Sequence, residues 1–440
     1  MIAVVGMGRS GLAAARLLSD RGVEVWATDV STSPLLRKEF DAARIPYEAG
    51  THSEDRLKAA DEIVVSPGVP PDIAPLRVAR EAGVPVLSEL ELASRFLEGD
   101  IVAITGSNGK TTTTSLVGHI LRLGSRPVEI GGNIGRAVSD MVRDSTPETI
   151  NVVEVSSFQL EGIRAFRPRV AALLNVTPDH LDRYDDFEGY RMAKFRLFMN
   201  QDESDVAILN CADPGTFPPP VDIRARQRLF SRAPLSEGAG IAGHMLTVDQ
   251  EPVLGVDQVP LRGQHNLENV LAALLVADVY GIPVDTVRDG VRSFKGVEHR
   301  LETVADIDGV LYVNDSKATN VDSAVKALEA FDSDIILIAG GVDKGTGLDP
   351  LVEAMTGRVR YLITLGSAAP RIEAAVGQRV PLRRVADMSE AVLRARGLAR
   401  PGDVVLLAPA CASFDMYANY EARGRDFKNA VHSHAGVSTQ

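Results

Sequence analysis

The sequence predicts a protein of the α/β class with about three domains, and three observations support this prediction. The chain has 440 residues, which is more than one hydrophobic core usually serves. Short apolar runs typical of buried parallel strands alternate with helical patterns along the whole chain. Each run ends in a loop rich in Gly, Pro, Ser or Asn, and open α/β sheets bind ligands at that end of their strands. The expected strands include residues 2–5, 63–65, 101–105, 152–155, 171–175, 335–339 and 404–407.

Composition and charge narrow the class of protein further. Hydrophobic residues make up 45% of the chain and charged residues 24%, as in folded globular proteins. The formal net charge of -12 repels nucleic acid, so we expect no nucleic-acid partner and a local basic site for any phosphate ligand. Cys211 and Cys411 lack a CxxC pair, which argues against a disulfide framework or a thiolate metal site. We find no leader-like segment and no apolar run of about 20 residues, so we expect a cytoplasmic protein without a membrane span.

The first glycine-rich turn, Gly6-Met-Gly8-Arg-Ser-Gly11, has the spacing of a dinucleotide-binding loop. It precedes a helical run over residues 12–19, and Asp29 closes the next apolar strand, residues 23–28. The glycines allow close backbone approach, the helix amides face a diphosphate, and the acid accepts a hydrogen bond from a ribose or base. Alone, the pattern is typical of an NAD-dependent enzyme. The same geometry serves other nucleotide diphosphates, and some such folds bind none.

The second glycine-rich turn spans residues 105–112 and again lies between an apolar strand and a helical run, residues 113–123. In a phosphate loop the backbone amides hold phosphates, Lys110 reaches the β and γ oxygens, and Thr111 binds Mg²⁺. The turn departs from the strict pattern because Ile104 occupies the position of the first glycine. A solvated Gly-Lys turn at a helix start is the alternative. The flanking strand and helix favour the phosphate loop, with contacts to ATP from Gly106, Ser107, Asn108, Gly109, Lys110, Thr111 and Thr112.

Two nucleotide-type sites in one chain indicate an energy source and a nucleotide-linked substrate. The run Thr-Gly-Ser-Asn-Gly-Lys-Thr-Thr-Thr at 105–113 resembles the variant phosphate loop of the Mur ligases and of their folylpolyglutamate synthetase relatives. Within the Mur family, Glu-Val-Ser-Ser-Phe-Gln-Leu at 154–160 and Pro-Ala-Cys-Ala-Ser-Phe-Asp at 409–415 look like the D-glutamate-adding member. The similarity extends along nearly the whole chain, through residues 131–135, 154–160, 175–184, 265–269, 299–300, 314–320 and 408–415.

The expected boundaries between domains lie near residues 91–100, before the second glycine-rich turn, and near residues 295–300. Together with the resemblance, they give three domains. We expect a Rossmann-like domain for the UDP-linked substrate at residues 1–93, a central P-loop ATPase domain with a mostly parallel sheet at residues 94–297, and a Rossmann-like domain for the amino acid at residues 298–440.

The resemblance implies an ATP-dependent ligase that adds D-glutamate to UDP-N-acetylmuramoyl-L-alanine in the synthesis of peptidoglycan precursors. A free carboxylate forms no amide at a useful rate because oxide is a very poor leaving group, so ATP first converts it to an acyl phosphate. This step needs charge neutralisation around the γ-phosphoryl group. We expect Lys110 and two Mg²⁺ ions to supply it, in an enzyme that acts as a monomer.

The resemblance also gives roles to three further residues of the catalytic centre. Glu154 is similar to the ligand of the first Mg²⁺, with a capping or surface-loop carboxylate as the alternative. His180 resembles a ligand of the second Mg²⁺, although a lone histidine is more often structural. Lys194 matches a lysine that CO₂ carbamylates, which would convert an ammonium into an anion beside the second ion. From the helical pattern alone Lys194 would be an exposed surface lysine, and carbamylation needs a neutral amine.

The same resemblance assigns residues along the chain to the binding of the three substrates. Asn266 and Asn269, about one helical turn apart, are similar to adenine contacts. Arg300, Asp315 and Lys317 would complete an ATP site between domains that closes when nucleotide binds. An inter-domain ion pair is the alternative role for Arg300, and a turn cap is the alternative role for Asp315.

The remaining matches concern the other two substrates. Val30 and Ser31 do not reproduce the Thr-Arg pair that follows the matching acid in some relatives, and Tyr420 replaces an expected phenylalanine. An ordinary loop lysine is the alternative for Lys344. The UDP-linked substrate is matched by Ser10, Asp29, Gly68, Asn133, Ser156 and Gln159, and the amino acid by Thr319, Lys344, Ser413 and Tyr420.

Three rival functions stay open at this point. A folylpolyglutamate-type ligase shares the phosphate loop but lacks a complete nucleotide fold before it, which the residues ahead of Thr105 disfavour. An NAD-dependent oxidoreductase leaves Lys110 and Glu154 without a role. A non-catalytic nucleotide-binding regulator would bind ATP without amino-acid-dependent release of phosphate.

Overall fold

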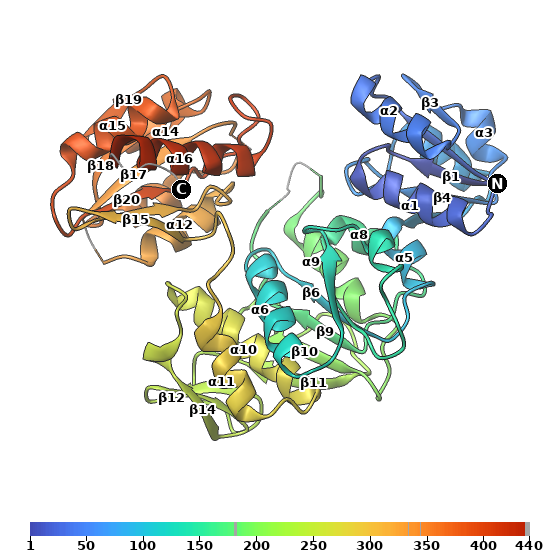
Figure 1. The fold of residues 1–440 in the computed structure, drawn as a ribbon, viewed down its shortest axis with the longest axis horizontal. Coiled ribbons are helices and arrows are strands. Elements are labelled where there is room, and N and C mark those ends of the chain that lie inside the picture. The colour runs from blue at the N-terminus through green and yellow to red at the C-terminus, as the bar shows by residue number, and fades with distance from the viewer. Residues whose placement is uncertain (180–182, 333, 344, 436–440) are drawn as a thin grey trace. The chain divides into compact units, whose positions relative to one another are not determined.

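The computed structural model describes residues 1–179, 183–332, 334–343 and 345–435, and Figure 1 shows its ribbon. Within these residues the strands form three sheets of five, nine and six strands, most of them parallel, so the predicted α/β class is confirmed. The chain divides into two compact units, Met1–Gly255 with Asn269–Val291 and Val256–Glu268 with Arg292–Gln440. Among the described helices none is both long and apolar enough to cross a membrane.

The first sheet is parallel throughout and is covered by helices on both faces. Its elements are β1 (Ile2–Val5), β2 (Val25–Asp29), β3 (Tyr47–Ala49), β4 (Glu62–Val65), β5 (Val86–Ser88), α1 (Arg9–Asp20), α2 (Pro34–Ala43), α3 (Glu54–Lys58) and α4 (Ala74–Glu81). The strand order is β3-β2-β1-β4-β5. Along β1, Val4 packs with residues of α1 and α2, whereas Ala3 and Val5 pack with residues of α3 and α4. Apolar residues at successive positions therefore suit this strand.

The second sheet belongs to the same unit and has the order β14-β13-β12-β11-β10-β9-β6-β8-β7. Its strands are β6 (Asp100–Thr105), β7 (Val128–Gly132), β8 (Ile150–Glu154), β9 (Val170–Leu173), β10 (Val206–Asn210), β11 (Arg226–Phe230), β12 (Ala239–Ala242), β13 (Met245–Val248) and β14 (Glu251–Gly255). Only the pairs β12–β13 and β13–β14 are antiparallel among the described pairs of this sheet. The helices and helical turns along this stretch and just after it are α5 (Glu89–Ser94), α6 (Lys110–Leu123), α7 (Val138–Met141), α8 (Ser157–Glu161), α9 (Phe187–Phe195), η1 (Arg196–Phe198), η2 (Val256–Gln258), α10 (Gln264–Val279) and α11 (Val284–Ser293).

The third sheet lies in the second unit and has the order β15-β16-β20-β17-β18-β19. Its elements are β15 (Glu302–Ile307), β16 (Val310–Asn314), β17 (Ile335–Gly340), β18 (Val359–Leu365), β19 (Leu382–Arg384), β20 (Val404–Leu407), α12 (Val321–Glu329), α13 (Asp349–Met355), α14 (Ala369–Val376), α15 (Met388–Leu398) and α16 (Tyr420–Ala435). Leu337 and Leu406 pack with residues of α12, α13 and α14, whereas Ile338 and Leu407 pack with residues of α15 and α16. Helices therefore cover both faces here as well.

The predicted strands are all present, but the two helices that follow the glycine-rich turns begin earlier than predicted. Helix α1 begins at Arg9 and α6 at Lys110, because Gly8 and Gly109 are the residues that cap them. Threonine has a low intrinsic helix propensity, so the pattern alone places the start of α6 three residues too late. Residues 111–114 are buried against the sheet, and this packing stabilises the first turn.

Two buried carboxylates on α5 join the first two sheets of unit one. The Glu89 carboxylate accepts a hydrogen bond from the Ser139 amide at 2.6 Å. The Glu91 carboxylate accepts from three successive amides, those of residues 164, 165 and 166, at 2.8, 3.0 and 2.9 Å. Both side chains are at most 1% exposed. Burial raises the pKa of Glu89 to about 6.

This raised pKa gives a prediction about stability. The Glu89 carboxyl is neutral below its unfolded pKa of 4.5, and its ionisation destabilises the folded state by up to about 2 kcal/mol once the pH rises past 6. Glu89→Gln keeps an oxygen for the Ser139 amide without the charge. We expect it to raise the free energy of unfolding by about 2 kcal/mol at pH 8 and to change it little at pH 4.5. Urea unfolding at both pH values tests this, with Glu81→Gln on an exposed part of α4 as the control. An equal effect at both pH values would contradict the assignment.

Candidate active site

The second glycine-rich turn forms a compact loop between β6 and α6. Gly109 has a φ of +84°, and a Cβ at this position would lie 2.3 Å from the Asn269 side-chain oxygen, so only glycine fits. The Lys110 ammonium donates to the carbonyl oxygens of Gly106 and Ser107, both at 2.8 Å. The positive end of α6 and an ammonium therefore meet at one loop, which is the arrangement that binds phosphate oxygens.

The segment after β9 holds this loop from one side. The Asn175 side chain accepts from the Asn108 amide at 2.8 Å and donates to the Asn108 carbonyl at 3.1 Å. The Ser107 hydroxyl donates to the Thr177 carbonyl at 3.0 Å and lies 3.2 Å from the Tyr190 hydroxyl. These contacts hold the loop in the shape described.

Glu154 is buried beside the loop at the carboxyl end of β8. Its exposed fraction is 1%, so the alternative of a surface-loop carboxylate is wrong. One carboxylate oxygen accepts from the Asn133 side chain at 2.9 Å. The other, Oε2, is buried and has no hydrogen-bond partner among the described residues. A buried anionic oxygen without a partner is costly, and a bound cation would remove that cost. Thr111, the second residue of α6, is 5% exposed.

Lys194 is also buried, so the alternative of an exposed surface lysine is wrong. Its side chain is 1% exposed, its Nζ donates to the Gly106 carbonyl at 2.9 Å, and the same atom lies 4.4 Å from the centre of the Tyr190 ring. Burial and the neighbouring Lys110 hold the pKa of Lys194 well below its usual value, against the attraction of Asp179 and Glu154. Both effects favour the neutral, nucleophilic amine that carbamylation requires.

The loop that follows β9 carries the predicted second metal ligand, His180, which lies outside the described residues. Arg183, just beyond it, donates to the Glu161 carboxylate at 3.0 Å and to the Pro67 carbonyl at 3.3 Å. Its guanidinium also lies 3.7 Å from the centre of the Phe158 ring. Arg183 thus ties this loop to α8 and to the loop after β4.

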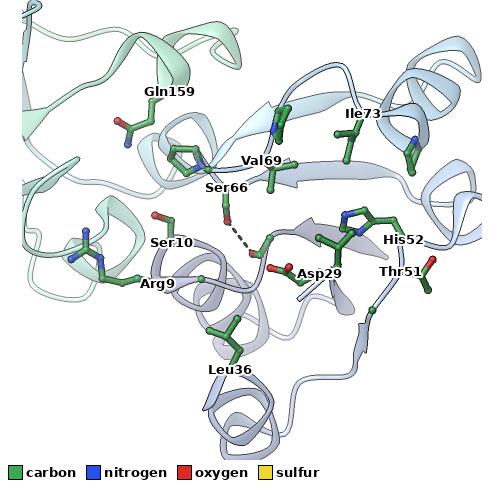
Figure 2. A pocket seen from close by; sticks show the side chains of 18 of the residues that line it. Arg9, Ser10, Asp29, Leu36, Thr51, His52, Ser66, Val69, Ile73 and Gln159 are labelled. Carbon is green, nitrogen blue, oxygen red and sulfur yellow. Dashed lines mark hydrogen bonds between the residues drawn. The ribbon is translucent and has the colours of Figure 1, made fainter. Parts of the chain in front are cut away.

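A cavity of about 1030 Å³ opens at the carboxyl ends of the first sheet and reaches residues of the second (Figure 2). Five of the six residues predicted to bind the UDP-linked substrate line it: Ser10, Asp29, Gly68, Asn133 and Gln159. Ser156 is not among the lining residues. Its hydroxyl accepts from the Gln159 amide at 3.2 Å and caps α8, while its own amide donates to the Gln159 side chain at 3.0 Å. Ser156 therefore orients Gln159.

Asp29 shapes the first glycine-rich turn. Its carboxylate accepts from the Met7 amide at 2.6 Å and from the Ser31 amide at 2.8 Å. Each carboxylate oxygen can accept more than one hydrogen bond, so these contacts leave capacity for a ligand. Asp29, which the sequence predicts to contact the nucleotide, therefore also holds the glycine-rich turn and the residues after β2 in place.

The other predicted ATP residues lie on α10 and in the second unit. Asn266 and Asn269 are three residues apart on α10 and are 7% and 3% exposed. Asp315 follows β16 and accepts from the Leu301 amide at 3.3 Å. Burial raises the pKa of Asp315 to about 6, although the charges of Arg300 and Lys317 oppose this rise. The structure therefore brings Arg300, Asp315 and Lys317 together.

The residues predicted to hold the amino acid follow neighbouring strands of the third sheet. Thr319 comes after β16 and Ser413 after β20, and these strands are paired in parallel. Tyr420 begins α16, and the Lys317 Nζ lies 5.1 Å from the centre of its ring. Lys344 lies outside the described residues.

An arginine that the sequence did not mark links these two loops. Arg423 is 2% exposed and donates to the Ser316 hydroxyl at 3.0 Å, to the Ser316 carbonyl at 2.8 Å and to the Cys411 carbonyl at 3.1 Å. Burial lowers its pKa to about 10. The loop after β16 and the loop after β20 are thereby held by one guanidinium.

Comparison with known families matches all three parts of the chain. Residues 1–88 match the family model "Mur ligase MurD-like, N-terminal domain", residues 104–277 match "Mur ligase middle domain", and residues 299–411 match "Mur ligase, glutamate ligase domain". The chain belongs to the Mur ligase family. Similar proteins include the UDP-N-acetylmuramoylalanine--D-glutamate ligase of Acidobacterium capsulatum, 47% identical over 99% of this chain and 97% of that protein. The protein of the same name from Salinibacter ruber is 45% identical over 97% of this chain and 96% of its own.

Solved structures of Mur ligases share the fold. The UDP-N-acetylmuramate-alanine ligase of Thermotoga maritima covers 98% of this chain and 99% of its own, with a TM-score of 0.64 at 19% identity. The MurF ligase of the same organism, solved in complex with ADP, gives a TM-score of 0.65 at 18% identity over 93% of this chain and 96% of its own. At this level of identity the likeness concerns the three-domain architecture.

Several residues of this Mur ligase site were not predicted from the sequence. Asn175 and Tyr190 hold the phosphate loop, and Arg423 joins two loops of the third sheet. Asn175 is the last residue of an expected strand, and Tyr190 lies four residues before Lys194 on one helix, so the sequence could have indicated both. No feature of the sequence indicated Arg423, because only the tertiary fold brings it to Ser316.

Proposed function

We propose that this chain catalyses the reaction that names its relatives, the ATP-dependent addition of D-glutamate to UDP-N-acetylmuramoyl-L-alanine. The observation that carries the proposal is the link between the cavity and the phosphate loop. Asn133 lines the cavity and donates to Glu154, which is buried beside Lys110 and Lys194. A sugar-nucleotide acid in the cavity would therefore have its carboxylate end near the terminal phosphate of ATP.

The reaction follows from this juxtaposition. A carboxylate oxygen of the alanyl group attacks the γ-phosphorus, the bond to the β-γ bridging oxygen breaks, and ADP leaves. The amine of D-glutamate then attacks the acyl carbon, loses a proton, and phosphate leaves with the oxygen that came from the carboxylate. Lys110 stabilises the charge that develops on the γ-phosphoryl oxygens, and the α6 amides hold the phosphates in line.

Mg²⁺ fits the donor set at this place. The buried Glu154 Oε2 has no partner among the described residues, and the Thr111 hydroxyl stands at the start of α6. Thr111 and Glu154 would hold one ion, and His180 with a carbamate on Lys194 would hold another. When bound, the ions neutralise phosphate charge. The neutral Lys194 amine would receive CO₂, giving a carbamate anion among the positive groups.

The resemblance also assigns residues to the other two substrates. Asn266, Asn269, Arg300, Asp315 and Lys317 are assigned to the adenine nucleotide. The glutamate carboxylates are assigned to Thr319, Lys344 and Ser413, and Tyr420 supplies an aromatic wall. Because the reaction consumes ATP and a nucleotide-linked precursor, we place the enzyme in the cytoplasm. We also propose that it acts as a monomer and that its three domains meet near residues 93 and 297.

Release of phosphate from ATP in the presence of UDP-N-acetylmuramoyl-L-alanine tests the proposal. We expect D-glutamate to stimulate release, and L-glutamate, D-aspartate, L-alanine and meso-diaminopimelate to give less than about one hundredth of that rate. Stimulation by another amino acid alone would leave a ligase with a different substrate. Binding of NADH without any amino-acid-dependent release of phosphate would favour an oxidoreductase.

A further inference from the structure

The end of the cavity beyond Asp29 carries a histidine that no sequence motif marked. His52 follows β3, and the amide of Gly50 in the same loop donates to the Asp29 carbonyl at 2.8 Å. His52 lines the cavity together with the apolar side chains of Leu36 and Ile73. Figure 2 shows His52 at one end of the cavity and Gln159 at the other. A planar, mostly apolar group with a few polar edges would suit the His52 end.

The order of the groups along the cavity identifies which part of a nucleotide lies there. Gly8 and Ser10 stand at the N-terminus of α1, which favours a diphosphate. Asn133 and Gln159 lie at the end that adjoins the catalytic centre, where the sugar acid belongs. Figure 2 shows Ser10 between Gln159 and His52, with Asp29 beyond it. The base is therefore left to the His52 end.

The hydrogen bonds of Thr28 determine which nitrogen of His52 carries the proton. The Thr28 hydroxyl is buried and donates its only proton to the Thr51 carbonyl at 2.8 Å, because a carbonyl can only accept. Its contact of 3.0 Å with His52 Nδ1 must then be one that it accepts. Nδ1 therefore carries the hydrogen, and in the neutral ring Nε2 is an acceptor. Among the described residues, the ring of His52 makes a hydrogen bond through Nδ1 and none through Nε2.

Burial favours the neutral ring. It lowers the pKa of His52, although the carboxylates of Asp29 and Glu48 oppose this effect. At the pH of the cytoplasm the ring thus offers the cavity one acceptor and no donor.

We infer that His52 Nε2 accepts the N3–H of uracil and so selects a uracil nucleotide over a cytosine nucleotide. This inference rests on the proposed function, which supplies the uracil nucleotide. Uracil carries a hydrogen on N3, whereas N3 of cytosine is an acceptor. A cytosine in the same position would set two lone pairs against each other and leave both without a partner. His52 thus determines which base is bound, and Thr28 positions the His52 ring.

Calorimetric titration with UDP and CDP tests this inference at pH 8. The unchanged protein should bind UDP at least about 10-fold more tightly than CDP. His52→Phe keeps a flat ring without the acceptor, and it should lose about 10-fold in UDP affinity while its UDP to CDP ratio falls to near one. Thr28→Val, which frees the ring tautomer, should lower the ratio by a few fold. His244→Phe, in the exposed turn between β12 and β13, is the matched control and should change neither value.

The outcomes separate this inference from the proposed function. If His52→Phe keeps the preference of the unchanged protein for UDP, the inference is overturned. If UDP is preferred, the preference depends on His52, and D-glutamate still fails to stimulate phosphate release, the inference holds and the proposed reaction is wrong. If the unchanged protein binds ATP but neither UDP nor UDP-N-acetylmuramoyl-L-alanine, both are overturned.

Discussion

Lys110→Ala is expected to lower the rate of D-glutamate addition by about 10³-fold or more, while UDP-N-acetylmuramoyl-L-alanine still binds. The Lys110 ammonium lies over the carbonyls of Gly106 and Ser107, at the first residue of α6. Charge builds up on the γ-phosphoryl oxygens as the phosphoryl group transfers, and a fixed cation in a largely buried loop stabilises that charge strongly. The effect should therefore fall mainly on kcat.

Steady-state phosphate release measures this effect. Lys38→Ala, at an exposed position on α2, is the control and should keep the full rate. Circular dichroism of both variants checks the fold. A Lys110→Ala enzyme that keeps more than about one tenth of its kcat would show that this ammonium does not face the transferred group.

Lys194→Met is expected to lower kcat by about 10²-fold or more, through loss of the carbamate and not through loss of packing. Methionine fills much of the buried volume, and removing an amine from a buried position should not lower the melting temperature. Burial and Lys110 hold the pKa of this amine well below its usual value, which favours the neutral form that reacts with CO₂. Activity of the unchanged enzyme should therefore fall in buffers freed of CO₂ and return when bicarbonate is added.

Carbon-13 spectroscopy gives an independent measure of the modification. After incubation with labelled bicarbonate, the unchanged protein should show a carbamate carbonyl signal that Lys194→Met lacks. Lys326→Met, on the half-buried surface of α12, is the control and should keep the signal. A signal that survives in Lys194→Met, or a CO₂-independent activity, would assign the modification elsewhere or remove it from the mechanism.

The fold was predictable from the sequence because the parallel strands are covered on both faces. Such strands carry apolar residues at successive positions, as Ile2–Val5 and Val404–Leu407 do, and these two were predicted with the observed limits. The starts of α1 and α6 were predicted too late. The low intrinsic helix propensity of threonine does not decide the conformation of Thr111. This residue is buried at the helix start, where packing against the sheet outweighs that propensity.

The candidate site was predictable only where the chemistry is local in the sequence. Glu154 is the last residue of β8, and Lys110 follows β6 after the short glycine-rich turn, so a turn and a strand suffice to place them. The burial of Lys194 could not be derived from its helical pattern, since the neighbours that bury it come from other segments. His52 and Arg423 depend on which strands are adjacent in a sheet, and a single sequence does not give that order.

Transfer of oxygen from the substrate to phosphate is the measurement that tests the account most directly. UDP-N-acetylmuramoyl-L-alanine is labelled with ¹⁸O in its alanyl carboxylate and turned over with ATP and D-glutamate, and the phosphate is analysed by mass. Attack of the carboxylate on the γ-phosphorus beside Lys110 predicts one labelled oxygen in each phosphate. Phosphate that contains no label, together with normal formation of the amide, would contradict activation at this loop.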